Sequence, residues 1–293
     1  LEKSNKPSKN TWKNIVLRTN NDPLTRMLQL KTGEVDVVYN DFPAEYLTYA
    51  QAQGDNVIQA PSYSYTYLGV NHRPTRATAD KTLRTIINSS LNKKLLYQQF
   101  YNINKYNEPS IVTKTIANND YYKFNSVANK HTKSEGYNLT LAISNNAQSR
   151  LIAQTIQKQL KSRNININIT PMDWNTYYER LQKGEFDLYL LTWTGPFMAD
   201  MYFRLFHSSQ TPPNGLNRGF YRNQELDLAL EQLMRASNNA KLVADIEKMK
   251  AENLIDIPLW SAPHSLVSKS YIKGCGISRD GGYRKLLSCY RIK

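Results

Sequence analysis

The sequence contains few of the residues and motifs from which metal centres and catalytic sites are built. It has four histidines, widely separated along the chain, and two cysteines, whereas a zinc site needs closely spaced pairs or further ligands. A Gly-x-Ser-x-Gly elbow, a Walker loop and a His-Glu-x-x-His helix are absent from it. We therefore expect a protein that is not an enzyme and that needs no cofactor or metal.

Long hydrophobic runs are also missing. No apolar stretch of the 293 residues approaches the roughly 18 residues that a membrane helix requires. The first residue, Leu1, is not methionine, so we expect any signal peptide or lipid anchor to lie upstream of it. A hydrophobic content of 40% is enough for one large core or two moderate ones.

Acidic residues are outnumbered, and the formal net charge is +14. The basic excess is scattered apart from the C-terminal tail, and the chain shows neither a recognition-helix pattern nor an aromatic RNA-binding signature. We therefore expect no nucleic-acid partner. Attraction to an anionic membrane surface or to an acidic partner explains the charge at least as well.

The two cysteines, Cys275 and Cys289, lie near the C-terminus. Their spacing suits neither a zinc site nor a redox Cys-x-x-Cys pair. One hypothesis is a disulfide across a β-hairpin, which implies an oxidising compartment. The alternative is two unpaired thiols in a packed tail.

One phrase occurs twice, as KTGEVD at residues 31–36 and as KGEFD at residues 183–187. Each copy ends an amphipathic stretch and opens an apolar run, which predicts a helix, a glycine cap and a strand. Gly33 and Gly184 would supply the left-handed residue that ends each helix. Two copies so far apart indicate two α/β lobes, and two lobes imply a cleft between them.

The remaining pattern predicts alternating strands and helices. In the first part we expect strands at 14–19, 35–39, 57–60 and 65–71, with helices at 24–31, 44–53 and 80–101. In the second part we expect strands at 138–143, 165–169 and 186–193, with helices at 147–161 and 174–183. The strand and helix spacing of the second part favours largely parallel pairing.

Aromatic side chains are the candidate binding residues. Tyr63, Tyr65 and Tyr67 alternate, so on a strand their rings share one face. Trp174 begins a predicted helix and Trp193 ends a predicted strand, and ligand sites of α/β proteins lie at the carboxyl ends of strands. The alternative is that these aromatics are ordinary core residues.

The order of several stretches resembles the extracellular solute-binding proteins of family 5, the peptide and nickel type that serves ABC transporters. The stretches that carry the resemblance are residues 26–36, 67–71, 80–84, 173–193, 217–230, 257–260 and 272–274. The resemblance implies an α/β fold of the two-lobed, periplasmic-binding-protein-like type II, here lacking the family's N-terminal part. It places the first lobe at 1–105, the second at 106–262 and a return to the first at 263–293.

The resemblance also implies a function. Such a protein captures a short peptide or peptide-like solute in the interlobe cleft and delivers it to the membrane permease of an ABC transporter, and it is periplasmic or anchored at the cell surface. One alternative is a metal-chelate ligand of the nickel type. Another is the ligand-sensing domain of a transcription regulator.

For the site, the resemblance implies that Tyr67, Trp174 and Trp193 line the cleft. The backbone of Thr192 and Thr194 would pair with an extended peptide.

The loop after Trp193 departs from the peptide-binding pattern. Peptide-binding members have an aspartate three residues after this tryptophan, where it meets the ligand's ammonium group, and this chain has Pro196. Asp200 lies at the wrong spacing to replace it. The stretch from Trp193 to Phe197 is instead similar to that of nickel-type members, which implies that Phe197 contacts the ligand.

Overall fold

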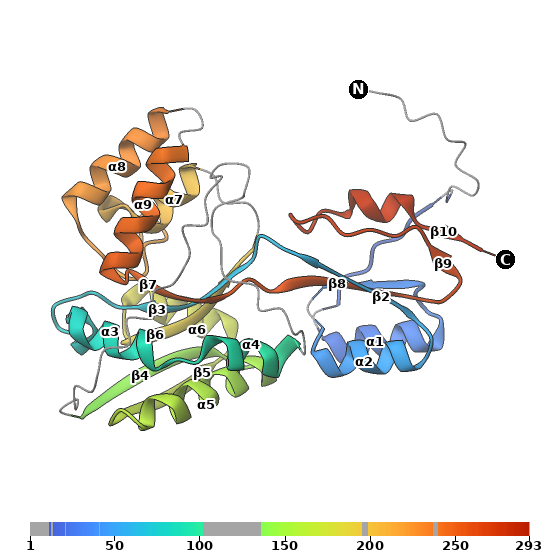
Figure 1. Cartoon of the computed structure of the whole chain (residues 1–293), viewed down its shortest axis with the longest axis horizontal. Helices are drawn as coiled ribbons and strands as arrows, with labels where there is room; N and C mark the ends of the chain where they lie inside the picture. The colour runs from blue at the N-terminus through green and yellow to red at the C-terminus, as the bar shows by residue number, and fades with distance from the viewer. Residues whose placement is uncertain are drawn as a thin grey trace. The chain divides into compact units, whose positions relative to one another are not determined.

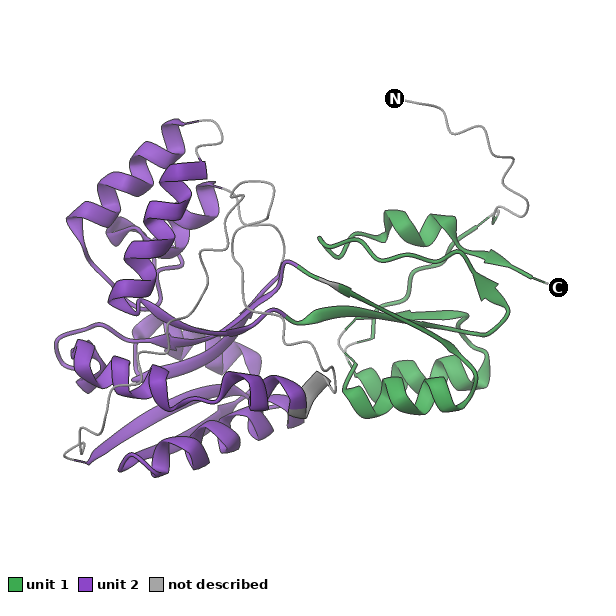
Figure 2. Ribbon diagram, in the orientation of Figure 1, with its two compact units in different colours: residues 1–62, 100–102, 262–293 green, residues 63–99, 103–261 purple. Residues whose placement is uncertain are grey.

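The computed structural model divides into two compact units (Figures 1 and 2). It describes residues 12–101 except 13, 21 and 41, and residues 136–194, 199–236 and 240–292. Unit 1 comprises residues 1–62, 100–102 and 262–293, and unit 2 comprises residues 63–99 and 103–261. The first boundary therefore lies at residue 62 and not near residue 105, because the strand that follows residue 63 belongs to the sheet of unit 2. The expected crossing segment at 106–135 lies outside the described residues.

Unit 1 is built on a small antiparallel sheet. Its strands are β1 (Val37–Tyr39), β8 (Pro263–Ser268) and β2 (Asn56–Pro61), in that order. Helices α1 (Pro23–Thr32) and α2 (Ala44–Ala52) pack on it through Met27, Leu30, Leu47 and Ala50. The prediction of a strand at 14–19 was wrong. These residues form no strand, and Ile15, Val16 and Leu17 are exposed.

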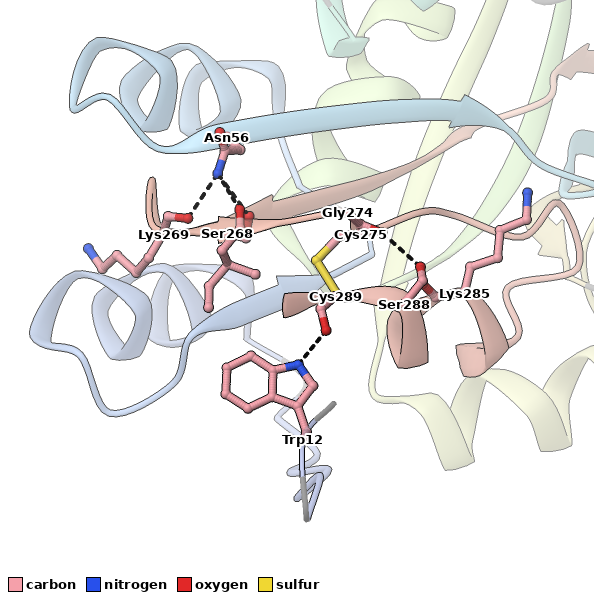
Figure 3. The surroundings of a disulfide bond; sticks show 10 residues. Trp12, Asn56, Ser268, Lys269, Gly274, Cys275, Lys285, Ser288 and Cys289 are labelled. Atoms are coloured by element: carbon pink, nitrogen blue, oxygen red, sulfur yellow. Dashed lines mark hydrogen bonds between the residues drawn. A yellow bond between two sulfur atoms is a disulfide. The ribbon is translucent and has the colours of Figure 1, made fainter. Parts of the chain in front are cut away.

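The C-terminal tail of unit 1 is closed by a disulfide between Cys275 and Cys289 (Figure 3). It lies beside the antiparallel pair of β9 (Ile272–Lys273) and β10 (Tyr290–Arg291), and a 3-10 helix, η3 (Tyr283–Ser288), separates the two strands. The indole Nε1 of Trp12 donates a 2.6 Å hydrogen bond to the carbonyl of Cys289. This hydrogen bond joins the disulfide-closed tail to a residue near the start of the described chain.

Unit 2 is built on a five-stranded mixed sheet with the order β5-β4-β6-β3-β7. β5 (Ile165–Met172), β4 (Tyr137–Ser144) and β6 (Leu188–Trp193) are parallel, as the spacing of the second part predicted. β3 (Tyr65–Val70) pairs antiparallel with β6 and with β7 (Asp256–Trp260). α5 (Ala147–Lys161) and α6 (Trp174–Lys183) connect the parallel strands.

The two repeated glycines end their helices as the sequence predicts. Gly33 has φ 76° and Gly184 has φ 66°, and the backbone N–H of each caps the preceding helix. After Gly184, the carboxylate of Asp187 accepts hydrogen bonds from the backbone N–H and the hydroxyl of Thr140 on β4. The turn therefore also sets the register between β6 and β4.

The helix expected at 80–101 is two helices, α3 (Lys81–Ser90) and α4 (Lys93–Tyr101). Leu91 is extended, and the side chain of Asn92 accepts from the backbone N–H of Leu95, which starts α4. An asparagine that caps a new helix outweighs the continuous apolar pattern here. The remaining helices of unit 2 are η1 (Ala77–Ala79), α7 (Ala199–Phe206), η2 (Ser208–Gln210), α8 (Gln224–Arg235) and α9 (Ala240–Asn253).

Figure 1 shows α7, α8 and α9 together at one end of unit 2. Their buried faces join Tyr65, Tyr67 and Tyr189 of the sheet in one hydrophobic cluster. Within the part of the chain that the structure describes, no helix has both the length and the hydrophobicity to span a bilayer.

Candidate functional site

A hollow of about 190 Å³ opens on unit 2 at the carboxyl end of β6. Five of the residues singled out from the sequence line it together with four others; the full lining is Tyr67, Trp174, Tyr178, Leu181, Leu191, Thr192, Trp193, Thr194 and Arg218. β3, α6, β6 and the loop before α8 contribute these residues. The lining thus includes four aromatic side chains and one charged side chain.

Trp174 is held at the hollow by the start of α6. The Asp173 carboxylate accepts from the backbone N–H groups of Asn175 and Thr176 and caps the helix. The pKa of Asp173 is lowered, most by a hydrogen bond from the Thr176 side chain and further by those from the backbone N–H groups of Thr176 and Asn175. The indole is 57% exposed, and its ring lies 6.3 Å from that of Tyr178. Trp174 is therefore not a core residue.

The end of β6 offers backbone groups as well as side chains. β6 pairs with β3 from Leu188 to Trp193, but with β4 only at Leu188 and Tyr189. The Leu190 carbonyl accepts a 2.6 Å hydrogen bond from the Tyr177 hydroxyl. Beyond Leu190, no described strand pairs with β6 on the β4 side, and Thr192 and Thr194 are exposed.

The three alternating tyrosines have different positions. Tyr65 and Tyr67 are buried and stacked, with ring centroids 5.3 Å apart, and burial raises the pKa of both hydroxyls. Tyr67 reaches the hollow, whereas Tyr65 lies behind it and lines an adjacent cavity of about 20 Å³. Tyr63 precedes β3, is half-buried and does not line the hollow.

Sequence reasoning missed Arg218 and Tyr178. Tyr178 lies four positions after Trp174 on α6, a spacing that places both on one helix face, so the helical period could have found it. Arg218 belongs to the stretch 217–230, which contributed only to the family resemblance. The ring of Tyr178 lies 5.1 Å from the Arg218 guanidinium carbon. Phe197 lies outside the described residues.

A buried cluster of charges lies behind the small cavity. The Lys250 ammonium is 3.4 Å from the Glu247 carboxylate and 4.0 Å from the Asp256 carboxylate. Asp256 also accepts from the Tyr65 hydroxyl at 3.1 Å, and the Phe206 ring lies 4.1 Å from the ammonium. Burial raises the pKa of Glu247 to about 7, with Lys250 opposing and Asp256 adding to the shift.

This raised pKa makes the stability of the folded chain depend on pH. The folded state keeps the Glu247 proton up to about pH 7, while the unfolded state loses it near pH 4.5. The associated stability is complete below about pH 4.5 and is lost as the pH rises through 7. We therefore expect Glu247→Gln to gain stability relative to wild type on going from pH 5 to pH 8, by on the order of 2 kcal/mol.

Urea denaturation of both proteins at each pH measures this difference. His72 has a pKa lowered by burial to about 4, which gives the wild type an opposite slope, so only the pairwise difference is informative. Glu252→Gln is the matched control, since Glu252 is an exposed partner of Lys248 on the same helix. A difference that is flat with pH would contradict the prediction.

Metal ligands do not gather in the part of the chain that the structure describes. There, no three His, Cys, Asp or Glu side chains are placed to hold an ion. The ring nitrogens of His72, His207 and His264 instead lie within hydrogen-bond distance of Ile255, Ser209 and Asn40.

Comparison with known proteins identifies the family. Residues 3–214 match the family model described as bacterial extracellular solute-binding proteins, family 5 Middle. The di/tripeptide-binding protein 3 of Pseudomonas aeruginosa is 24% identical over 302 aligned residues, which cover 89% of this chain and 53% of that protein. The chain therefore spans about half the length of this curated relative.

Solved structures show the same fold. A dipeptide-binding protein from Pseudoalteromonas in complex with Met-Leu superposes with a TM-score of 0.74 at 20% identity, covering 93% of this chain and 57% of that one. NikA from Brucella suis in complex with Fe(III)-EDTA gives 0.74 at 18% identity, covering 92% and 60%. Because the family model covers most of the sequence, the chain belongs to the bacterial extracellular solute-binding proteins of family 5.

Proposed function

We propose that this protein binds a short peptide or peptide-like solute and delivers it to the membrane permease of an ABC transporter, as an exported protein. The observation that carries the proposal is the aromatic hollow at the end of β6, where Trp174 is exposed and where, on the β4 side, no described strand pairs with Thr192 or Thr194. The names of the Pseudomonas aeruginosa and Pseudoalteromonas proteins, which refer to di/tripeptides and a dipeptide, support it.

The backbone of β6 suits an extended peptide. A strand edge without a partner presents N–H and C=O groups that a peptide can pair with, and such pairing is independent of the peptide's side chains. This edge of β6 begins after Tyr189, the last residue that pairs with β4. Thr192 and Thr194 would supply main-chain groups to the ligand, while Trp193 continues the pairing with Tyr65 of β3.

The aromatic rings suit ligands of varied side chains. Tyrosine and tryptophan offer a large contact area at a small loss of conformational entropy. Trp174 and Tyr178 stand on one helix, and Tyr67 approaches from the sheet. This arrangement favours binding over catalysis.

Replacing Trp174 by alanine tests the proposal. We expect peptide affinity to fall tenfold or more, since an exposed tryptophan at the centre of a binding surface contributes about 2 kcal/mol or more. Native mass spectrometry with a pool of random di- and tripeptides identifies binders, and calorimetry with a retained peptide measures the loss.

Tyr49→Ala is the matched control, because Tyr49 is an exposed aromatic residue of unit 1 that does not line the hollow. Retention of no peptide by the wild type would refute the proposed function. Equal peptide affinities of wild type and Trp174→Ala would show that the hollow is not the peptide-binding site.

A metal chelate is the second candidate ligand. An aromatic hollow with a single cation suits a compact anionic chelate. The structural likeness to NikA in complex with Fe(III)-EDTA supports the same candidate ligand. The metal would be held by the chelator, since the described residues offer no cluster of ligands for it. Adding nickel with histidine to the same mass-spectrometric experiment tests this candidate directly.

A further inference from the structure

Arg218 gives the hollow a positive charge that no lining carboxylate balances. It is the charged residue among those that line the hollow, and neither an aspartate nor a glutamate lines it within the described residues. Asp256 does not line the hollow; it lines the small adjacent cavity, which Arg218 also borders, and there Tyr65 and Lys250 already engage it. Asp200 is exposed on α7 and does not line the hollow.

The Arg218 guanidinium is buried with unused hydrogen-bonding capacity. The residue is only 9% exposed, and its Nε has no hydrogen-bond partner among the described residues. It forms no ion pair with a described carboxylate either. The guanidinium faces the Tyr178 ring, and its charge lowers the pKa of the nearby Tyr67 hydroxyl against the larger, raising effect of burial. A buried cation is unfavourable unless it is paired, and the described residues supply no carboxylate that pairs with this one.

The backbone around Arg218 is held in place before any ligand arrives. The buried Asn217 donates to the carbonyls of His207 and Tyr221 and accepts from the Tyr221 backbone N–H. The Gly219 carbonyl accepts from the His72 backbone N–H. A Cβ at Gly219 would lie 2.9 Å from the Val70 carbonyl oxygen, so this close approach requires glycine. The guanidinium therefore projects from a rigid loop, which reduces the entropy lost on binding.

We propose that Arg218 binds a carboxylate of the ligand, so that the hollow accepts the acidic group of a peptide-like solute and not its ammonium group. This inference rests on the proposed function and names the ligand group that this part of the site selects. A guanidinium matches a carboxylate with paired N–H donors, and the aromatic walls exclude water around the pair. The carboxylate comes either from the C-terminus of the ligand or from an acidic side chain.

End-capped peptides test the proposal and separate the two sources. We would offer the wild type three pools of random tripeptides without aspartate or glutamate, one N-acetylated with a free carboxylate, one C-amidated with a free ammonium, and one capped at both ends. A fourth pool, capped at both ends, would carry one glutamate. Native mass spectrometry measures the retained fraction of each pool, and nickel with histidine is offered separately.

We expect the wild type to retain a carboxylate-bearing pool at least tenfold better than the amidated pool. Preference for the acetylated pool identifies the C-terminus as the source, and preference for the glutamate pool identifies a side chain. Arg218→Met should lose this preference, while Arg218→Lys, which keeps the charge without the planar fork, should keep part of it. Thermal unfolding of each variant checks that it folds.

Other outcomes overturn the proposal in distinguishable ways. Equal or better retention of the amidated pool by the wild type refutes the role of Arg218 but leaves the peptide-binding function standing, and this result needs no variant. An unchanged preference in Arg218→Met refutes it as well. If only the nickel complex is retained, the peptide function fails, and the proposal stands only when Arg218→Met weakens that retention. Retention of nothing overturns both.

Discussion

Lys250→Met is expected to lower the free energy of unfolding by about 3–5 kcal/mol at pH 7.5. The side chain is 3% exposed and lies between the carboxylates of Glu247 and Asp256. Methionine occupies a similar volume, so the main effect is the loss of the cation. Two buried acidic groups then remain without their counter-charge, which is far more unfavourable than the original cluster.

The charge explanation has two further consequences. The loss should be smaller at pH 5, because Glu247, whose pKa is about 7, is then already neutral. Adding Glu247→Gln and Asp256→Asn to Lys250→Met should recover most of the stability, since the two carboxylates that lost the Lys250 ammonium are then replaced by neutral amides.

The matched control is Lys248→Met on the same helix. Lys248 is 67% exposed and pairs with Glu252 at 3.8 Å, so its loss should change stability by less than about 1 kcal/mol. Urea denaturation followed by tryptophan fluorescence measures all of these variants. A Lys250→Met protein as stable as Lys248→Met would show that the cluster contributes nothing.

Gly184→Ala should destabilise the chain by about 2–5 kcal/mol, whereas Gly33→Ala should cost about 1–2 kcal/mol. Both glycines have positive φ, so both substitutions introduce the same backbone strain. At Gly33 an added Cβ meets nothing within 4 Å, but at Gly184 it would lie 2.5 Å from the Phe220 ring and 2.7 Å from the Arg73 guanidinium.

The surroundings of Gly184 cannot move aside easily. Arg73 lies 3.6 Å from the centre of the Phe220 ring and donates to the Lys183 carbonyl. The buried Asn71 donates to the Gly184 carbonyl at 3.0 Å. Thermal unfolding of the two variants side by side measures the comparison, and equal losses would mean that strain alone governs both positions.

Local patterns predicted much of unit 2, because its strands and helices alternate with clear signals. Asp173 caps the start of α6 and Gly184 ends it, so the predicted range of this helix, 174–183, agrees with the observed one. Those same signals placed Trp174 at a helix start and Trp193 at a strand end. Local patterns therefore pointed to two of the residues that line the hollow.

Features that depend on distant pairing could not be predicted. β3 joins the sheet of unit 2 through antiparallel pairing with β6 and β7. The local sequence of Tyr65–Val70 does not indicate which strands it will pair with. Arg218 reaches the hollow only because Asn217 fixes a loop that has no periodicity. Tyr63 fits the same alternation as Tyr67 but does not reach the hollow, because the strand begins only at Tyr65.

Strands β2 and β8 bear on how the chain can be engineered. Pro61 lies opposite Pro263 in their ladder, so the polypeptide leaves unit 1 and re-enters it at adjacent positions. All of unit 2, including the entire lining of the hollow, consequently lies within residues 63–261, a single stretch in which only residues 100–102 belong to unit 1. Ligand preference could be exchanged between relatives by swapping that cassette at its two neighbouring junctions.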